Sequence, residues 1–262
     1  MNTIYWTSRS AMNASEQKLQ VISNNIANST TTGYKKVQAN FSDLLYENID
    51  RKGVPNSRDN NLTSPSHGNG VRVSSTVRNH SQGSLLATGL STNVAIDGEG
   101  YFRVKLGTPI NGQEYGYTRN GSFQVDVNGN IVDEKGNFLD IDFLPGYENT
   151  RFTENNFEVG KSGDIYVSNG NTTTKVGNIS LYNTIGSGGF VSVADSLYVQ
   201  ADGSNIYKDE SSKLYQGYLE NSNVDMADEL SDLIITQRVF QMNSKMLQTG
   251  DEMYGMVNNL RK

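Results

Sequence analysis

The sequence predicts an α+β fold in which two long terminal helices pair with each other and enclose an all-β middle domain. Apolar residues recur at helical spacing at both ends of the chain, while short β-prone runs separated by turn dipeptides fill the middle. We therefore expect a discontinuous, coiled-coil-like helical assembly domain (1–46 and 217–262), an extended connector (47–93 and 200–216) and a β-rich outer domain (94–199).

The first helix is predicted over residues 3–28, where neither Gly nor Pro interrupts the chain. Its apolar residues recur at intervals that place them on one narrow stripe of a helix about 39 Å long. The stripe consists of Ile4, Ala11, Leu19, Ile22 and Ile26. The segment from Ser29 to Gly33 contains four hydroxyl residues and a glycine, and we expect it to end the helix.

Residues 47–93 are predicted to be a loop or extended connector, because Gly and Pro recur among Asn, Ser and Asp. Within this segment only Val71, Val73 and Val77 indicate a strand.

Farther along, the short β-prone runs between 94 and 199 are separated by pairs such as Asn111-Gly112 and Asn120-Gly121. These pairs tolerate the positive φ angles of tight hairpin turns, so the segment is predicted to be antiparallel β structure.

The end of the chain returns to helical spacing. Ser222 and Asp225 have the spacing of a capping box at a helix start. Beyond them, two apolar rows repeat every seven residues, which predicts a coiled-coil-like helix about 55 Å long. One row contains Met226, Leu233, Phe240, Leu247 and Tyr254, and the other contains Val239, Met246, Met253 and Leu260. One helix pair leaves much of both rows uncovered, so we expect neighbouring subunits to cover them.

Composition excludes several classes of protein. A net charge of −6 supplies no basic excess to neutralise phosphates, so we expect no nucleic-acid partner. There is no cysteine, which excludes disulfides and zinc-thiolate sites. The sequence shows no apolar run long enough to cross a bilayer and no Sec-type signal peptide, so we expect neither membrane insertion nor export by that route.

No motif for catalysis, metal binding or cofactor binding emerges. The two histidines, His67 and His80, lie in the polar connector without the spacing of metal ligands, and there is no GxSxG motif. Asp140 and Asp142, one strand repeat apart, leave open an alternative of a different class, a hydrolase or glycan-binding module built on the β domain. We expect no catalytic residue, metal or cofactor.

Two terminal segments carry a family resemblance: KLQVISNNIANSTTTGYKK (18–36) and GYLENSNVDMADELSDLIITQRVFQMNSKMLQTGDEM (217–253). Together they resemble the bacterial flagellar rod and hook protein family. Segments 68–89, 93–104 and 117–139 resemble the distal-rod members, with a proximal rod or hook paralogue as the alternative. The motif residues are Asn24, Asn25, Ala27, Asn28, Thr32, Gly33, Tyr34, Lys35, Ser222, Asn223, Val224, Gln237, Arg238, Asn243, Ser244 and Lys245.

The resemblance implies a structural subunit of the flagellar basal body, not an enzyme. Such subunits leave the cell unfolded through the flagellar type III export apparatus and self-assemble into a hollow helical shaft that transmits torque. The implied partners are further copies of the chain and neighbouring rod and hook proteins. The expected assembly interface comprises Ile4, Ala11, Leu19, Ile22, Ile26, Leu233, Val239, Phe240, Met246, Leu247, Met253 and Leu260. Its burial on assembly would couple folding to polymerisation.

Overall fold

A computed structural model describes residues 2–48, 66–154, 156–169, 172–186, 188–194 and 196–260. Terminal helices flank a β-rich middle, so the predicted α+β class is confirmed. The chain forms two compact units. Unit 1 comprises 1–26, 37–77 and 226–262, and unit 2 comprises 27–36 and 78–225. The domain limits expected from the sequence stay a prediction.

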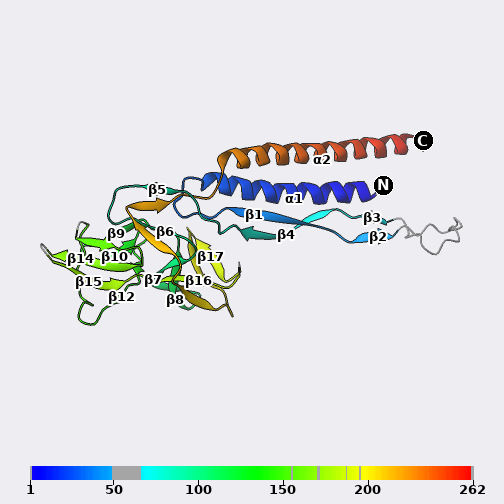
Figure 1. The fold of residues 1–262 in the computed structure, drawn as a ribbon. Coiled ribbons are helices and arrows are strands. Elements are labelled where there is room, and N and C mark those ends of the chain that lie inside the picture. The colour runs from blue at the N-terminus through cyan, green and yellow to red at the C-terminus, as the bar shows by residue number, and fades with distance from the viewer. Residues whose placement is uncertain are drawn as a thin grey trace. The chain divides into compact units, whose positions relative to one another are not determined.

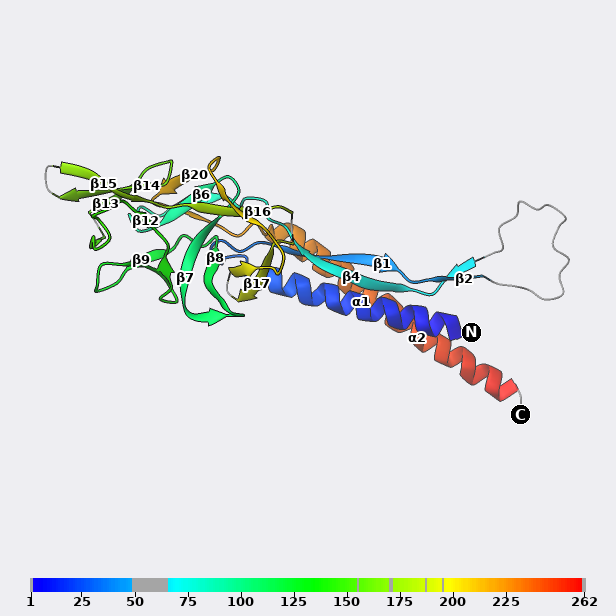
Figure 2. The same cartoon turned by 90° about the horizontal axis from the view of Figure 1, so that it is seen from below.

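Unit 1 contains both helices, α1 (Asn2–Ala27) and α2 (Met226–Leu260). They run antiparallel, and the last turns of α2 extend beyond the start of α1 (Figures 1 and 2). Within the part of the chain that is described, neither helix is long and apolar enough to cross a membrane.

The predicted capping box is wrong, because α2 begins only at Met226 and Ser222 Oγ instead accepts a hydrogen bond from the Val224 amide (3.3 Å).

A β ribbon lies along α1 in unit 1 (Figure 2). It consists of β1 (Val37–Asp43) paired with β4 (Val71–Arg78), and of β2 (Tyr46–Asn48) paired antiparallel with β3 (Ser66–Gly68). The amide of Val71 donates a hydrogen bond to Ser10 Oγ of α1 (3.3 Å) and so attaches the ribbon to the helix. The strand expected around Val71 is therefore confirmed, whereas the connector residues 49–65 lie outside the described part of the chain.

Unit 2 is built from antiparallel strands. In the larger sheet the order is β17 (Phe190–Ala194), β18 (Leu197–Gln200), β8 (Gln113–Thr118), β7 (Tyr101–Ile110), β11 (Phe138–Leu139), β10 (Ile131–Asp133) and β9 (Phe123–Val125), with β16 (Leu181–Thr184) on β7 and β19 (Ile206–Asp209) on β16. A second sheet has the order β12 (Asp142–Phe143), β15 (Thr172–Asn178), β14 (Asp164–Asn169) and β13 (Phe157–Val159). Two further pairs are β6 (Val94–Asp97) with β20 (Lys213–Gln216), and β5 (Leu85–Ala87) with β21 (Tyr218–Glu220).

Two of the predicted turn pairs show different uses of glycine. Between β7 and β8, Asn111 and Gly112 both adopt positive φ (52° and 78°), as a type I′ hairpin turn requires. Gly121, by contrast, is needed for close approach, because a Cβ there would lie 1.7 Å from the carbonyl oxygen of Val94. The Asn-Gly pairs thus mark turns and contacts in unit 2, as expected of a β domain.

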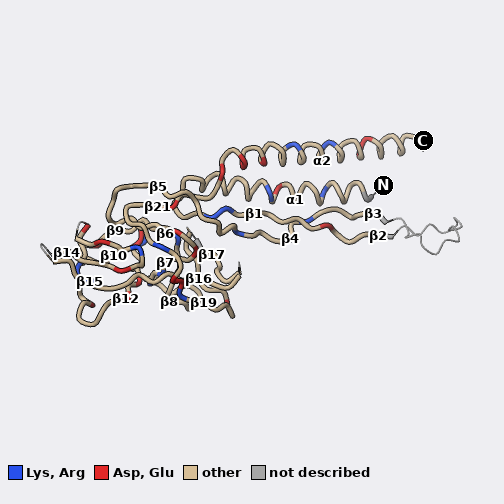
Figure 3. The backbone as a smooth tube through the Cα atoms, in the orientation of Figure 1, with Lys and Arg blue, Asp and Glu red and all other residues tan. Residues whose placement is uncertain are grey.

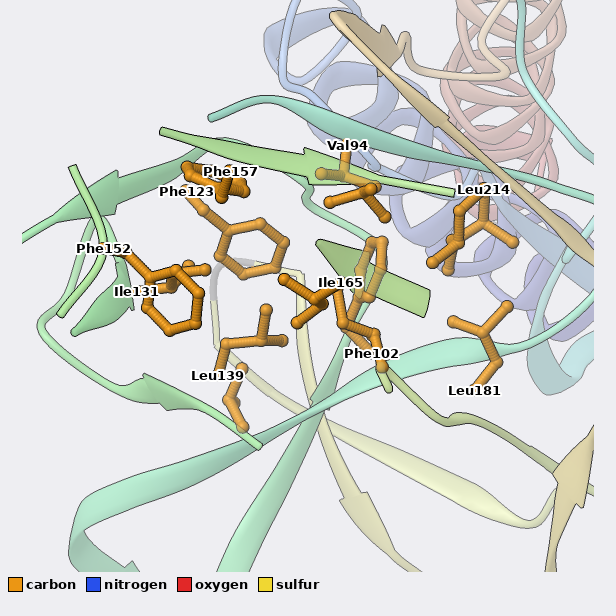
Figure 4. Close-up of a cluster of buried hydrophobic side chains, with 14 of the residues drawn as sticks. Val94, Phe102, Phe123, Ile131, Leu139, Phe152, Phe157, Ile165, Leu181 and Leu214 are labelled. Carbon is orange, nitrogen blue, oxygen red and sulfur yellow. The ribbon is translucent and has the colours of Figure 1, made fainter. Parts of the chain in front are cut away.

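The core of unit 2 lies between its strands. Phe102, Val104 and Ile165 are completely buried, and Figure 4 shows Phe102 and Ile165 among the surrounding aromatic and aliphatic side chains. A second buried cluster contains the four tyrosines Tyr101, Tyr117, Tyr182 and Tyr198. Burial of side chains of this size contributes about 1.5–3 kcal/mol each, so unit 2 has a substantial core of its own.

Candidate functional site

Three charged side chains from distant parts of the sequence meet inside unit 2. Lys35 Nζ donates hydrogen bonds to Glu220 Oε1 (2.7 Å) and to the carbonyl oxygen of Ser81 (2.8 Å). Arg119 Nε donates to the other carboxylate oxygen of Glu220 (2.6 Å). All three side chains are almost fully buried. We call Lys35, Arg119, Glu220 and Asn223, described below, the clasp.

Backbone groups satisfy the remaining hydrogen-bonding capacity of the ions. The terminal nitrogens of Arg119 donate to the carbonyl oxygens of Gly98 and Gly100, and the amide of Gly83 donates to Glu220 Oε1 (2.8 Å). A buried ion pair is tolerated only with such additional partners, because removing two charges from water costs several kcal/mol per ion. The clasp therefore depends on all its members.

Burial and the neighbouring charges of the clasp shift the pKa values of Lys35 and Glu220. Burial lowers the pKa of Lys35, and the positive charge of Arg119 lowers it further, while Glu220 acts in the opposite direction. For Glu220, burial alone raises the pKa, but Arg119 and Lys35 together outweigh it and hold the pKa below its ordinary value. Glu220 is consequently a carboxylate at neutral pH, between two cationic side chains.

Asn223 connects the three stretches of chain that link unit 2 to unit 1. Its Oδ1 accepts a hydrogen bond from the Lys36 amide (2.6 Å). Its Nδ2 donates to the carbonyl oxygens of Asn79 and Ser81 (both 2.9 Å), and its own amide donates to the carbonyl oxygen of Tyr34 (3.4 Å). The clasp thus holds residues 27–36, the segment after β4 and the segment before α2 together.

The glycine of the Gly-Tyr-Lys motif makes this approach possible. Gly33 adopts a φ of +66°, and a Cβ there would lie 2.7 Å from the amide nitrogen of Asn120. The Gly33 amide donates a hydrogen bond to the Glu220 carbonyl oxygen (2.8 Å). Next to it, the buried ring of Tyr34 lies 5.8 Å from the guanidinium carbon of Arg78, within range of a cation–π interaction.

A second buried polar contact lies in unit 1. Asn25 forms two hydrogen bonds with the backbone of Val37, donating to its carbonyl oxygen (2.9 Å) and accepting from its amide (3.0 Å). The same Nδ2 donates to Glu229 Oε2 on α2 (3.2 Å). Both side chains are buried. Because a buried polar contact of this kind fixes one register between helices, Asn25 and Glu229 position α1 against α2 and β1.

The apolar residues expected at the assembly interface differ in exposure. Ile22 is buried at 3% exposure. Half-buried members are Ala11, Leu19, Ile26, Leu233, Val239 and Leu247. Exposed members are Ile4, Phe240, Met246, Met253 and Leu260. The described chain thus covers part of the predicted rows.

The remaining family-motif residues lie outside the clasp. Asn24, Ala27, Gln237, Arg238 and Lys245 are exposed, whereas Asn28, Thr32, Ser222, Val224, Asn243 and Ser244 are half-buried. Sequence reasoning predicted no site role for Arg119, Glu220 or Glu229. No local pattern distinguishes these charges from the many solvated ones, because their burial depends on partners far along the chain.

A hydrolytic centre at the acidic pair is not supported. Asp140 is ion-paired with Arg103, and Asp142 Oδ2 with Lys208 Nζ (2.8 Å). His80 lines a cavity of 490 Å³ in unit 2, where its Nδ1 lies 2.5 Å from the Tyr101 hydroxyl. Burial, followed by the charges of Lys35 and other cations, lowers its pKa. Among the described residues no cluster of acidic or histidine side chains is arranged to hold a metal ion.

Known proteins match this chain along its length. Three family models match: flagella basal body rod protein (7–35), flagellar hook protein FlgE/F/G D1 domain (95–167) and flagellar basal body rod FlgEFG protein C-terminal (215–260). The flagellar basal-body rod protein FlgG of Buchnera aphidicola is 37% identical over 264 residues, which cover 97% of this chain and 98% of that protein. This chain belongs to the flagellar basal-body rod protein family.

Two more relatives support the same family. The flagellar basal-body rod protein FlgG of Borreliella burgdorferi is 33% identical over 269 residues, 98% of each chain. That of Caulobacter vibrioides is 35% identical over 265 residues, 97% of this chain and 98% of the relative. The predicted family, structural role in the rod and location in the flagellar basal body are confirmed, and assembly with other rod and hook components follows from membership.

In this flagellar basal-body rod protein, the clasp unites the three matched regions. Lys35 comes from the first, Arg119 from the second, and Glu220 and Asn223 from the third. Regions that are separate in the sequence therefore meet in one buried cluster of unit 2.

Proposed function

We propose that this protein is a distal-rod subunit that polymerises with copies of itself through the helices of unit 1, forming a hollow helical shaft that transmits torque. It adds to the growing structure after export, unfolded, through the flagellar type III apparatus, and it contacts neighbouring rod and hook proteins. The role requires repeated protein contacts and no catalysis.

The observation that carries the proposal is an apolar stripe on α2 that stays largely exposed in the described part of the chain. Ile235 is 58% exposed and Met242 is 60% exposed. Further exposed members are Met246, Met253, Met256 and Leu260. At 3.6 residues per turn these six residues lie on one side of the helix, within about a quarter of its circumference. Large exposed apolar surfaces of this kind mark sites of protein contact.

The opposite half of α2 is already occupied. Glu229 and Thr236 are buried, and Leu233 and Leu247 are half-buried on the side of the helix that meets α1 in unit 1. The helix thus has two apolar sides, one satisfied within the chain and the other available to a second copy. Covering the second side in the polymer stabilises the helices, which supports coupling of their folding to assembly.

The clasp supports a mechanical role. Its buried hydrogen bonds hold together the chain segments through which unit 2 continues into unit 1. Because interiors are close-packed and deform little, such a cluster suits a subunit that carries load between its parts.

The experiment is polymerisation of the purified full-length chain, followed by sedimentation velocity and electron microscopy. Ile235→Ser should prevent polymerisation while changing the unfolding free energy of the monomer by at most about 0.5 kcal/mol, since the side chain is exposed. The matched control Ile22→Ser alters a buried residue and should destabilise the helices themselves. A wild-type chain that stays monomeric under all conditions, with fully formed helices, contradicts the proposal.

A further inference from the structure

A small apolar hole lies between the start of α1 and the second half of α2 in unit 1. It has a volume of 150 Å³ and is lined by Ile4 and Tyr5 of α1 and by residues of α2 that include Gly250 and the stripe residues Met246 and Met253. Gly250 is one of the lining residues, and a Cβ added there would meet no atom of the described residues within 4 Å, so the hole leaves room for a larger side chain at this position. Its size suits a single aliphatic side chain, and its lining is mainly apolar and includes the acidic Asp251.

The same helix carries an unpartnered apolar side chain of suitable shape. Met242 is 60% exposed on α2. Arg238 precedes it by four residues and Lys245 follows it by three, so both cations lie beside it on the same side of the helix. Methionine is unbranched and adapts to irregular gaps, which makes it an effective side chain for insertion.

The charges near the two features have opposite signs. Figure 3 shows acidic residues at the start of α2, basic residues in the middle and acidic residues again towards the end. Within the described ranges, Arg238, Lys245 and Asp251 form no ion pair. Bringing the middle of one α2 to the hole of another would place Arg238 and Lys245 beside Asp251.

We propose that Met242 of one copy inserts into the hole at Gly250 of a second copy, with Arg238 and Lys245 facing Asp251 across the contact. The proposal rests on the proposed function and names one contact within the polymer. Arg238 and Lys245, two of the family-motif residues, would thereby form ion pairs between copies, which neither forms within the described part of the chain.

This geometry also determines the kind of assembly. Met242 and Gly250 are eight residues apart, which places them about 12 Å apart along the axis and about 80° apart around it. Met242 and the hole thus lie on different surface patches of the same helix. A contact between them is heterologous, because each copy contributes a different patch. A heterologous contact that does not close into a ring extends into a helical polymer, whereas a self-complementary contact would stop at a dimer.

The first test fills the hole in the full-length chain. Gly250→Leu should raise helix content, because leucine favours the helix more than glycine, and yet raise the concentration needed for polymerisation about tenfold or more by excluding Met242. Gly255→Leu is the matched control, since its Cβ would also meet no atom within 4 Å and it does not line the hole. It should raise helix content and polymerise like wild type. Normal polymerisation of Gly250→Leu overturns the proposal.

The second test uses the absence of cysteine from the chain. A chain carrying Met242→Cys and Gly250→Cys should form a ladder of disulfide-linked oligomers under mild oxidation, whereas each single variant should stay uncrosslinked. The two positions are about 12 Å apart along one helix, so they cannot form a bond within one chain. Dimers from Met242→Cys alone, or no ladder from the double variant under conditions where wild type polymerises, overturn the contact. Failure of wild type to polymerise contradicts the proposed function itself.

Discussion

Lys35 Nζ lies 2.7 Å from Glu220 Oε1 inside unit 2, and both side chains keep only 1% of their surface exposed. The two residues are 185 positions apart in the sequence. Arg119 adds a second cation on the other carboxylate oxygen. Glu220 is therefore the one anion that the two cations of the clasp share. Its substitution should consequently lower the stability of unit 2.

Replacing Glu220 should destabilise unit 2 strongly. Glu220→Gln leaves two buried cations without a counter-charge, which costs about 3–5 kcal/mol. Urea unfolding of the full-length chain, followed by tyrosine fluorescence, measures the loss. The control is Asp142→Asn, which removes an exposed pair with Lys208 and should cost at most about 1 kcal/mol. Equal effects of the two substitutions would show that the clasp is not a buried ionic cluster.

Acid should weaken unit 2 through the same carboxylate. Its folded-state pKa lies below the ordinary value of 4.5, so the folded state binds fewer protons than the unfolded state as pH falls. The contribution is complete above pH 4.5 and is lost as pH falls through the folded-state pKa. We expect Glu220→Gln to show a flatter dependence of unfolding free energy on pH below 4.5 than wild type. Parallel pH profiles for the two proteins contradict this assignment.

Asn25 should contribute much more to the stability of unit 1 than an exposed asparagine of the same helix does. Asn25→Ala leaves the partly buried amide and carbonyl groups of Val37 without this partner and removes a contact of the buried Glu229, at a cost of about 1–3 kcal/mol. Thermal unfolding of the polymer, measured by circular dichroism, should show a lower midpoint. Asn13→Ala, at an exposed position of the same helix, is the matched control and should shift the midpoint little. A larger shift in the control would refute the positioning role.

Gly33 should tolerate no side chain. Its φ of +66° costs a non-glycine residue roughly 1–2 kcal/mol, and a Cβ would also lie 2.7 Å from the Asn120 amide nitrogen. Gly203→Ala separates the two effects, because Gly203 has a φ of +79° and open space around it. We expect Gly33→Ala to lower the unfolding free energy by at least about 2 kcal/mol more than Gly203→Ala, as measured by urea unfolding. Similar losses at both positions would exclude the steric contribution.

Local patterns in the sequence determined the elements of this protein. Uninterrupted apolar periodicity placed both terminal helices, because a helix repeats every 3.6 residues and its buried side must follow that repeat. The Asn111-Gly112 pair marked a hairpin turn because few residues adopt positive φ. The terminal motifs indicated the family. Each of these signals depends on residues close together in the chain.

Only the tertiary structure decided which residues meet. Heptad spacing indicated apolar rows on α2 but not which side α1 covers, and the exposed residues Ile235 and Met242 belonged to neither predicted row. Likewise, Lys35 contacts Glu220 because β21, which ends in Glu220, pairs with β5 and lies close to residue 35. Burial and ion pairing depend on contacts between distant segments, and a single sequence records no such distances.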